Sequence, residues 1–293
     1  MKKILVTGSN GQLGNELKSL QNIFPHFEFI FTDRSLLDMS NIASIRQFCE
    51  VNDFDYCINT AAYTKVDLAE QESVLCNSIN ITAVETLAEI CFKKNIPFIH
   101  FSSDYVFNGK ATQPYTENDL TDPNGVYAKS KQGGEKALIQ LGTKYKDAKF
   151  CIIRTSWVYS TFGHNFVKTM LRLMNERPEI NVVNDQIGSP TYAKDLAITA
   201  LKAINRWEAG KKLSTIYNFS NEGVCSWFDF ASAIAEFIDY KGNVNPIKTS
   251  QYPTPAPRPA YSVLDKLKIK KELEIEIRSW EEALDECLQN VLK

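Results

Sequence analysis

The feature that most limits the fold of this sequence is the alternation, over its first half, of short apolar runs and longer helical stretches. The runs are rich in β-branched and aromatic residues: KKILVTG, FEFIFTD, DYCINTAA, IPFIHFSS and KFCIIRTSW. Between them lie stretches with helical periodicity: QLGNELKSLQ, IASIRQFCEVN, NITAVETLAEICFKKN and KSKQGGEKALIQL. Strands that alternate with helices of this length predict βαβ units and a parallel sheet. The runs are apolar at both alternating positions, which predicts helices on both faces of the sheet.

The second half of the chain is less regular and richer in proline. STIYNFSN, residues 214–221, predicts a strand that returns late to the same sheet, and SQYPTPAPRPAYS predicts a loop before two terminal helices. We therefore predict two parts, one of them discontinuous. A dinucleotide-binding domain is expected to comprise 1–155 and about 191–220, and a smaller substrate-binding lobe to comprise 156–190 and 221–293.

Charge and hydropathy argue against two classes of partner. The 293 residues carry 33 Lys and Arg against 35 Asp and Glu, a net charge of −2, whereas a nucleic-acid binder would show a basic excess. No apolar run approaches the ~18 residues of a membrane span, and the start of the chain has no signal-peptide apolar region. We expect neither nucleic acid nor membrane as a partner, and a cytoplasmic location.

The seven cysteines are scattered, and no CxxC pair is present. This pattern is typical of reduced core thiols in a cytosolic protein. The three histidines are dispersed along the chain, so no metal site is expected.

A glycine-rich turn follows the first predicted strand directly. VTGSNGQLGNEL places Gly8, Gly11 and Gly14 between that strand and a helix, with GxxGxxG spacing instead of the common GxGxxG. Gly8 would permit the tight turn, Gly11 the close approach of a pyrophosphate, and Gly14 the close packing of helix on strand. The free N–H groups of the helix would face the phosphates. The chain is therefore predicted to have a Rossmann-type, doubly wound α/β fold that binds a dinucleotide.

The end of the second predicted strand carries residues that bear on the choice of cofactor. Asp33 closes FEFIFTD, about where an acidic residue accepts from the adenosine ribose hydroxyls. Arg34 follows it and could pair with the 2′-phosphate of NADP. These neighbours favour opposite cofactors, so we expect NADPH and keep NADH as an alternative.

Small and polar side chains follow the next two predicted strands. Ala61 and Ala62 would let a cofactor lie against the chain, and Ser102, Ser103 and Asp104 would reach the crevice outside the carboxyl ends of the strands.

The spacing YxxxK occurs twice. Tyr127 and Lys131 open the helix after the serine-bearing strand, whereas Tyr145 and Lys149 precede the next strand and belong at the opposite rim of the sheet. Residues four apart share a helical face, and a nearby ammonium would lower the phenol pKa from about 10. Tyr127 is thus predicted to donate a proton, with Lys131 tuning it and Ser103 binding the same substrate oxygen.

These residues together resemble the extended short-chain dehydrogenase/reductase family, in its dTDP-4-dehydrorhamnose reductase branch. The similarity runs nearly end to end, through TGSNGQLG, NTAAYTKVDLAE, SSDYVFNG, YAKSKQGGE, RTSWVYSTFGHNF, VVNDQIGSPTYAKDLA and PRPAYSVLD. It implies catalysis by Ser103, Tyr127 and Lys131, and substrate contacts from Asp104 and Trp157. It also implies cofactor contacts at Gly11, Gln12, Leu13, Asp38, Met39, Ala61, Ala62 and Tyr63.

The expected activity is reduction of the C4 ketone of a dTDP-4-keto-6-deoxyhexose to give dTDP-L-rhamnose. Arg258, in the proline-rich loop, is a candidate for the substrate diphosphate. Dehydration is disfavoured because Asp104 is followed by Tyr105, where the 4,6-dehydratases carry a second carboxylate. The alternative is a non-catalytic regulatory subunit that resembles the β subunit of methionine adenosyltransferase. The oligomeric state, a homodimer included, stays open.

Overall fold

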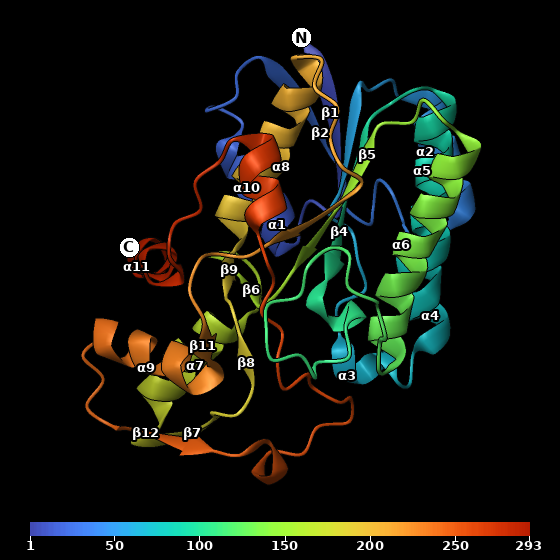
Figure 1. The fold of residues 1–293 in the computed structure, drawn as a ribbon. Coiled ribbons are helices and arrows are strands. Elements are labelled where there is room, and N and C mark those ends of the chain that lie inside the picture. The colour runs from blue at the N-terminus through green and yellow to red at the C-terminus, as the bar shows by residue number, and fades with distance from the viewer.

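A computed structural model describes residues 1–293, and a six-stranded sheet lies at its centre (Figure 1). The strand order is β10-β5-β4-β3-β1-β2, and all neighbouring strands are parallel. The strands are β1 Lys2–Thr7, β2 Phe27–Phe31, β3 Tyr56–Asn59, β4 Phe98–Ser103, β5 Phe150–Thr155 and β10 Ile216–Phe219. The order reverses between β1 and β3, which is where Rossmann-type sheets bind ligands. The predicted fold class is confirmed.

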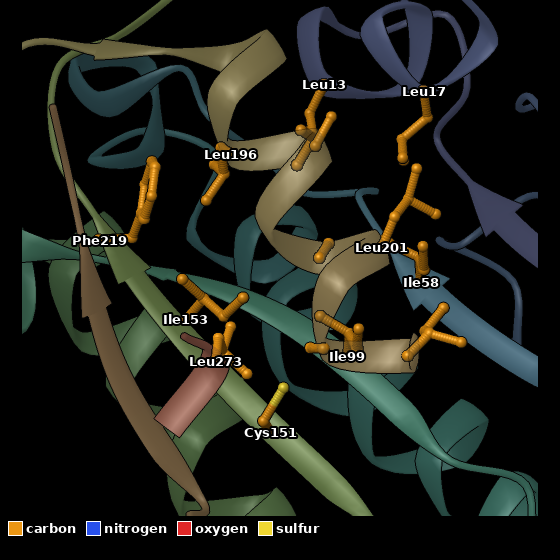
Figure 2. Packing of buried hydrophobic residues seen from close by; sticks show 14 of the residues in the cluster. Leu13, Leu17, Ile58, Ile99, Cys151, Ile153, Leu196, Leu201, Phe219 and Leu273 are labelled. Carbon is orange, nitrogen blue, oxygen red and sulfur yellow. The ribbon is translucent and has the colours of Figure 1, made fainter. Parts of the chain in front are cut away.

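Helices cover both faces of the sheet. Figure 1 shows α1, α8 and α10 on one face and α2, α5 and α6 on the other. Their bounds are α1 Gln12–Leu20, α2 Ile42–Val51, α5 Ala83–Lys93, α6 Val126–Lys144, α8 Ala193–Glu208 and α10 Leu267–Leu273. In Figure 2, Leu13 of α1 and Leu196 of α8 lie over the sheet, in one apolar cluster with Ile99 and Ile153 of the strands. Because both faces are covered in this way, the strands are apolar at successive positions.

The predicted late strand is confirmed. β10 adds to the edge of the sheet beside β5, with Ile216 opposite Ile152. The face of the sheet that α1 and α8 cover is also covered by α10, whose Ile269 and Leu273 belong to the apolar core on that face.

One helical stretch, Ser73–Lys93, has the length and mean hydropathy (1.2) of a membrane span. It consists of α4 Ser73–Asn77, a π-helical turn η1 Ser78–Thr82, and α5, with the short α3 Val66–Ala69 before it. In this fold it covers the sheet, because Val84, Leu87 and Cys91 of α5 are fully buried in the core on that face.

The remaining elements form a smaller lobe at the carboxyl ends of the strands, below the sheet in Figure 1. Three two-stranded pairs run through it: β6 Val158–Tyr159 with β9 Thr191–Tyr192, β7 Glu179–Val183 with β12 Asn243–Ile247, and β8 Ile187–Gly188 with β11 Cys225–Ser226. Its helices are α7 Phe166–Glu176, α9 Trp227–Phe237 and α11 Trp280–Val291, and the short 3-10 turns are η2 Asp104–Val106 and η3 Thr249–Gln251. These elements have a separate apolar core around Phe230.

The division into 1–155 with 191–220, and 156–190 with 221–293, stays a proposal. Since α10 packs against the core of the sheet, we would group it with the dinucleotide-binding domain instead of the smaller lobe.

All seven cysteines are free and buried. Burial raises the pKa of the Cys49 thiol to about 12, so it is protonated at neutral pH. No group of three His, Cys, Asp or Glu side chains is arranged to hold a metal ion.

A buried ion pair joins the sheet to α6. Arg154 of β5 donates to both carboxylate oxygens of Glu135, at 2.9 and 2.7 Å, and each side chain is only 3% exposed. Arg154 also lies over the ring of Phe107, 5.0 Å from its centroid. The pair fixes the helix that carries Tyr127 and Lys131 against the strand next to β4.

Candidate active site

A cavity of about 900 Å³ opens at the carboxyl ends of the strands, between the sheet and the smaller lobe. Most of the predicted site residues line it: Gly8, Gly11, Gln12, Leu13, Asp33, Arg34, Asp38, Met39, Ala61, Ala62, Ser103, Asp104, Tyr127, Lys131 and Trp157. Residues up to 149 positions apart in the sequence therefore meet in one site, as the parallel topology requires.

Three predicted residues lie outside the cavity lining. Gly14 packs against Ser9, which matches its predicted role in helix packing, because a Cβ there would be 2.5 Å from Ser9 Cα. Tyr63 is buried and donates its hydroxyl to Glu72 at 2.7 Å. Arg258 donates to Asp67 at 2.7 Å and to the Ala256 carbonyl at 3.0 Å. The structure thus places Arg258 as an anchor of its own loop and does not bring it to the cavity.

The glycine turn has the shape that a dinucleotide phosphate needs. Gly8 has φ +63°, and a Cβ there would be 2.6 Å from Ala61 Cα, so only glycine fits. At Gly11 a Cβ would meet only the Gly8 carbonyl, at 3.2 Å, and would otherwise enter the cavity. Gly11 is also the N-cap of α1, with no side chain capping the helix. The first N–H groups of α1 are therefore available to an anion.

One end of the cavity is formed by the loop after β2. Asp33 accepts from Ser35 Oγ (2.6 Å), Ser35 N (2.9 Å) and Asn10 Nδ2 (2.9 Å), and these bonds lower its pKa. Asp38 is similarly held by Ser40, which lowers its pKa. Arg34 is 78% exposed and lies 3.6 Å from Asp38. A carboxylate and an exposed guanidinium are thus both present at this end of the cavity.

Ser103 and Asp104 lie at the end of β4. Ser103 Oγ donates to Asp104 Oδ1 at 2.8 Å and accepts from the Tyr105 N–H at 3.2 Å. Asp104 Oδ2 and the neighbouring Ser102 Oγ are buried and have no hydrogen-bond partner, although both residues line the cavity. Unpaired buried polar atoms at a cavity wall indicate a place where a polar ligand binds.

Burial raises the pKa of Asp104 to about 7. Between about pH 4 and 7 the folded protein therefore holds a proton that the unfolded chain releases, so this carboxyl makes stability fall as pH rises through that window. Asparagine can accept the Ser103 bond but does not titrate. The unfolding free energy of the variant minus that of the unmodified protein is therefore expected to rise by about 3 kcal/mol from pH 5 to pH 8 in Asp104→Asn. Urea unfolding at both pH values tests this, and an equal difference at both would contradict it.

Tyr127 and Lys131 lie in the first turns of α6. The ring of Tyr127 packs edge-on against Tyr105, with centroids 5.6 Å apart, and Lys131 Nζ donates to the Phe101 carbonyl at 2.7 Å. Burial lowers the pKa of Lys131 to about 8. Burial also raises the pKa of Tyr127, an effect that a hydrogen bond with Ser103 partly opposes. The prediction that Lys131 lowers the phenol pKa is not met in this structure, because burial raises the pKa of Tyr127 and Lys131 is not among the groups that shift it. The phenol is therefore protonated and able to donate.

The second YxxxK pair is far from this site. Tyr145 follows the last residue of α6, 18 residues or about 27 Å of helix beyond Tyr127, and it donates to Glu89 at 3.0 Å. Lys149 lines a different, smaller cavity together with Lys146.

The smaller lobe contributes an aromatic wall. Trp157 stacks on Trp227 of α9, with ring centroids 3.6 Å apart and planes at 9°, and both line the cavity. Trp157 has φ +49°, a conformation that costs a bulky residue of order 1–3 kcal/mol.

Sequence reasoning missed several residues of the lining. Asn10, Thr64, Gly163, His164 and Trp227 are examples. Gly163 and His164 stand within the family-like stretch RTSWVYSTFGHNF, which could have pointed to them. The sequence around Trp227 does not mark it as a cavity residue, since an apolar residue in a helix is usually part of the core.

The fold and the site define a Rossmann-type protein of the extended short-chain dehydrogenase/reductase class. More narrowly, the chain belongs to the RmlD substrate binding domain family, whose model matches residues 1–293.

Similar proteins match along almost the whole chain. A spore coat polysaccharide biosynthesis protein, SpsK, of Bacillus subtilis is 43% identical, over 99% of this chain and 98% of its own. The dTDP-4-dehydrorhamnose reductase of Aggregatibacter actinomycetemcomitans is 39% identical, over 97% of each chain. The crystal structure of dTDP-4-dehydrorhamnose reductase from Bacillus anthracis in complex with NADP is 38% identical, with a TM-score of 0.91 over 99% of each chain.

Proposed function

We propose that this protein is a reductase that converts the C4 ketone of dTDP-4-dehydro-6-deoxy-L-mannose (dTDP-4-dehydrorhamnose) to the alcohol of dTDP-L-rhamnose, with NADPH as reductant. The observation that carries the proposal is that Ser103, Tyr127 and Lys131 line the same cavity as the glycine turn. Full-length relatives named dTDP-4-dehydrorhamnose reductase, one of them in complex with NADP, support the substrate and the cofactor.

The cofactor would be held by residues of the sheet domain. The N–H groups at the start of α1, beside Gly11, would bind the diphosphate, and Asp33 and Arg34 would contact the adenosine ribose and its 2′-phosphate. Further contacts are proposed for Gly8, Gln12, Leu13, Asp38, Met39, Ala61, Ala62, Tyr127 and Lys131, all of which line the cavity. The nicotinamide ring supplies the hydride when the cofactor is bound.

The protein's own side chains would handle the proton. Tyr127 donates it to the substrate oxygen from a protonated phenol, and Ser103 binds the same oxygen as negative charge develops on it. Lys131, whose pKa is about 8, would stabilise the phenolate that remains. Asp104 presents its unpaired Oδ2 to the hydroxyls of the sugar, and the indole of Trp157 presents a flat apolar face.

The alternative function, a non-catalytic regulatory subunit, gains no support from these relatives. A cytoplasmic location is also proposed, and the seven buried free thiols favour a reducing compartment.

The proposal is tested by mixing purified protein with NADPH and dTDP-4-dehydrorhamnose and following nicotinamide absorbance. We expect substrate-dependent loss of the signal and a product that co-elutes with dTDP-L-rhamnose. No oxidation of NADPH would reject the reductase, and stimulation of a methionine adenosyltransferase would support the alternative.

Cofactor preference is expected to depend on Arg34. Its guanidinium is exposed at the cavity wall and makes only the 3.6 Å contact with Asp38, so it is free to bind a 2′-phosphate. We expect Arg34→Ala to raise the KM for NADPH about tenfold, the loss of one exposed charge-assisted hydrogen bond, and to change the KM for NADH less than twofold. Arg46→Ala, on the solvent face of α2, is the matched control. An equal rise in both KM values would contradict the assignment.

A further inference from the structure

The aromatic wall of the cavity contains a strained residue that other residues hold in place. Trp157 joins β5 to β6 with φ +49°, although nothing in a two-strand connection requires a bulky side chain there. Strain of this kind persists only where the surroundings determine the conformation, and it concentrates at ligand sites. The neighbours of Trp157 therefore bear on the function of the site.

The indole of Trp157 has two close neighbours. One is Gly188 of β8, where a Cβ would be 2.7 Å from Trp157 Cε2, so a side chain at this position would displace the ring. The other is Trp227, stacked on Trp157 with ring centroids 3.6 Å apart.

A single pair of strands carries both of these neighbours. β8 pairs with β11, with Gly188 opposite Cys225, and Trp227 is the first residue of the helix that follows β11. The start of that helix is fixed by a capping box, in which Ser226 and Asp229 each bind the other's backbone N–H. Phe166 of α7 packs against Trp227, with centroids 4.6 Å apart.

We propose that Trp227 is a positioning residue for the sugar-nucleotide substrate. It holds the indole of Trp157 in its strained conformation and completes a rigid aromatic wall of the cavity. The ligand is the sugar-nucleotide substrate, whose sugar or pyrimidine ring would pack its apolar face on the flat indole. The wall belongs to the smaller lobe. The kinetic part of this inference rests on the proposed reductase function.

Three variants separate the possibilities. Trp227→Leu removes the stack, Trp227→Phe keeps an aromatic ring on Trp157, and Trp207→Phe alters a tryptophan of the sheet core, outside the cavity. Stacked indoles produce an exciton couplet in circular dichroism, which reports the Trp157–Trp227 pair without any substrate.

We expect Trp227→Leu to lose the couplet and to raise the KM for dTDP-4-dehydrorhamnose five- to tenfold, with the KM for NADPH unchanged. Trp227→Phe should lose the couplet but keep a substrate KM within twofold of the unmodified value. Trp207→Phe should keep the couplet and the unmodified substrate KM. A normal substrate KM in Trp227→Leu, or equal rises in both KM values, would overturn the proposal.

If the unmodified protein shows no reductase activity, the proposed function fails, and the positioning role is decided by binding alone. The probe is then dTDP, titrated by tryptophan fluorescence. A dTDP affinity at least fivefold weaker in Trp227→Leu than in Trp227→Phe would support the role, and equal affinities would reject it.

Discussion

Replacing Tyr127 by phenylalanine is expected to lower kcat by about 10²- to 10⁴-fold, the usual contribution of a positioned general acid. The substitution removes only the hydroxyl, so the ring keeps its edge-on contact with Tyr105 and α6 keeps its first turn. Binding of NADPH, measured by fluorescence titration, should change less than threefold. Steady-state kinetics with dTDP-4-dehydrorhamnose provides the measurement.

Tyr145→Phe is the matched control, because it removes the same hydroxyl from the other YxxxK pair. Tyr145 lies beyond the far end of α6, bonded to Glu89, and should leave kcat within twofold of the unmodified value. If Tyr127→Phe keeps more than a tenth of the kcat of the unmodified protein, another group donates the proton.

Truncating Glu135 is expected to cause the largest loss of stability, about 3–5 kcal/mol in the free energy of unfolding. Glu135→Ala leaves the guanidinium of Arg154 buried without its carboxylate, and the remaining Glu117 carbonyl at 3.4 Å cannot neutralise it. Urea unfolding followed by circular dichroism measures the change.

An exposed pair and a double variant test the cause of that loss. Glu176→Ala breaks the exposed pair with Arg172 and should cost less than about 1 kcal/mol. The double variant Glu135→Leu with Arg154→Met removes both charges and should recover most of the stability lost in the single variant. If the double variant is as unstable as Glu135→Ala, the unpaired charge is not the cause.

Much of the fold could be predicted because its signals are local. Each predicted strand is a short apolar run, and β1, β3 and β4 appear where KKILVTG, DYCINTAA and IPFIHFSS predict them. The glycine turn was recognisable because φ +63° at Gly8 excludes other side chains. The rule that ligands bind at the carboxyl ends of parallel strands then brought Ser103 and Tyr127 to one cavity and placed Tyr145 at the opposite rim.

Interactions between distant segments were harder to predict. Arg258 was expected at the substrate, and in the structure it donates to Asp67, 191 residues away in the sequence. The pKa of Tyr127 was expected to fall beside Lys131, but burial raises it. Burial of a side chain depends on every element packed around it and has no signature in the spacing of two residues.

The sequence alone thus determined the order of strands and helices, the glycine turn, and the placement of Tyr127 and Lys131 about one helical turn apart, because backbone sterics and helical periodicity act over a few residues. Only the tertiary structure decided which charges are neutralised, as in the Arg154–Glu135 pair, and that Trp227 stacks on Trp157. These interactions join segments that are far apart in the chain. Their strength depends on distance and on exclusion of water, which exist only once the sheet and the smaller lobe have packed together.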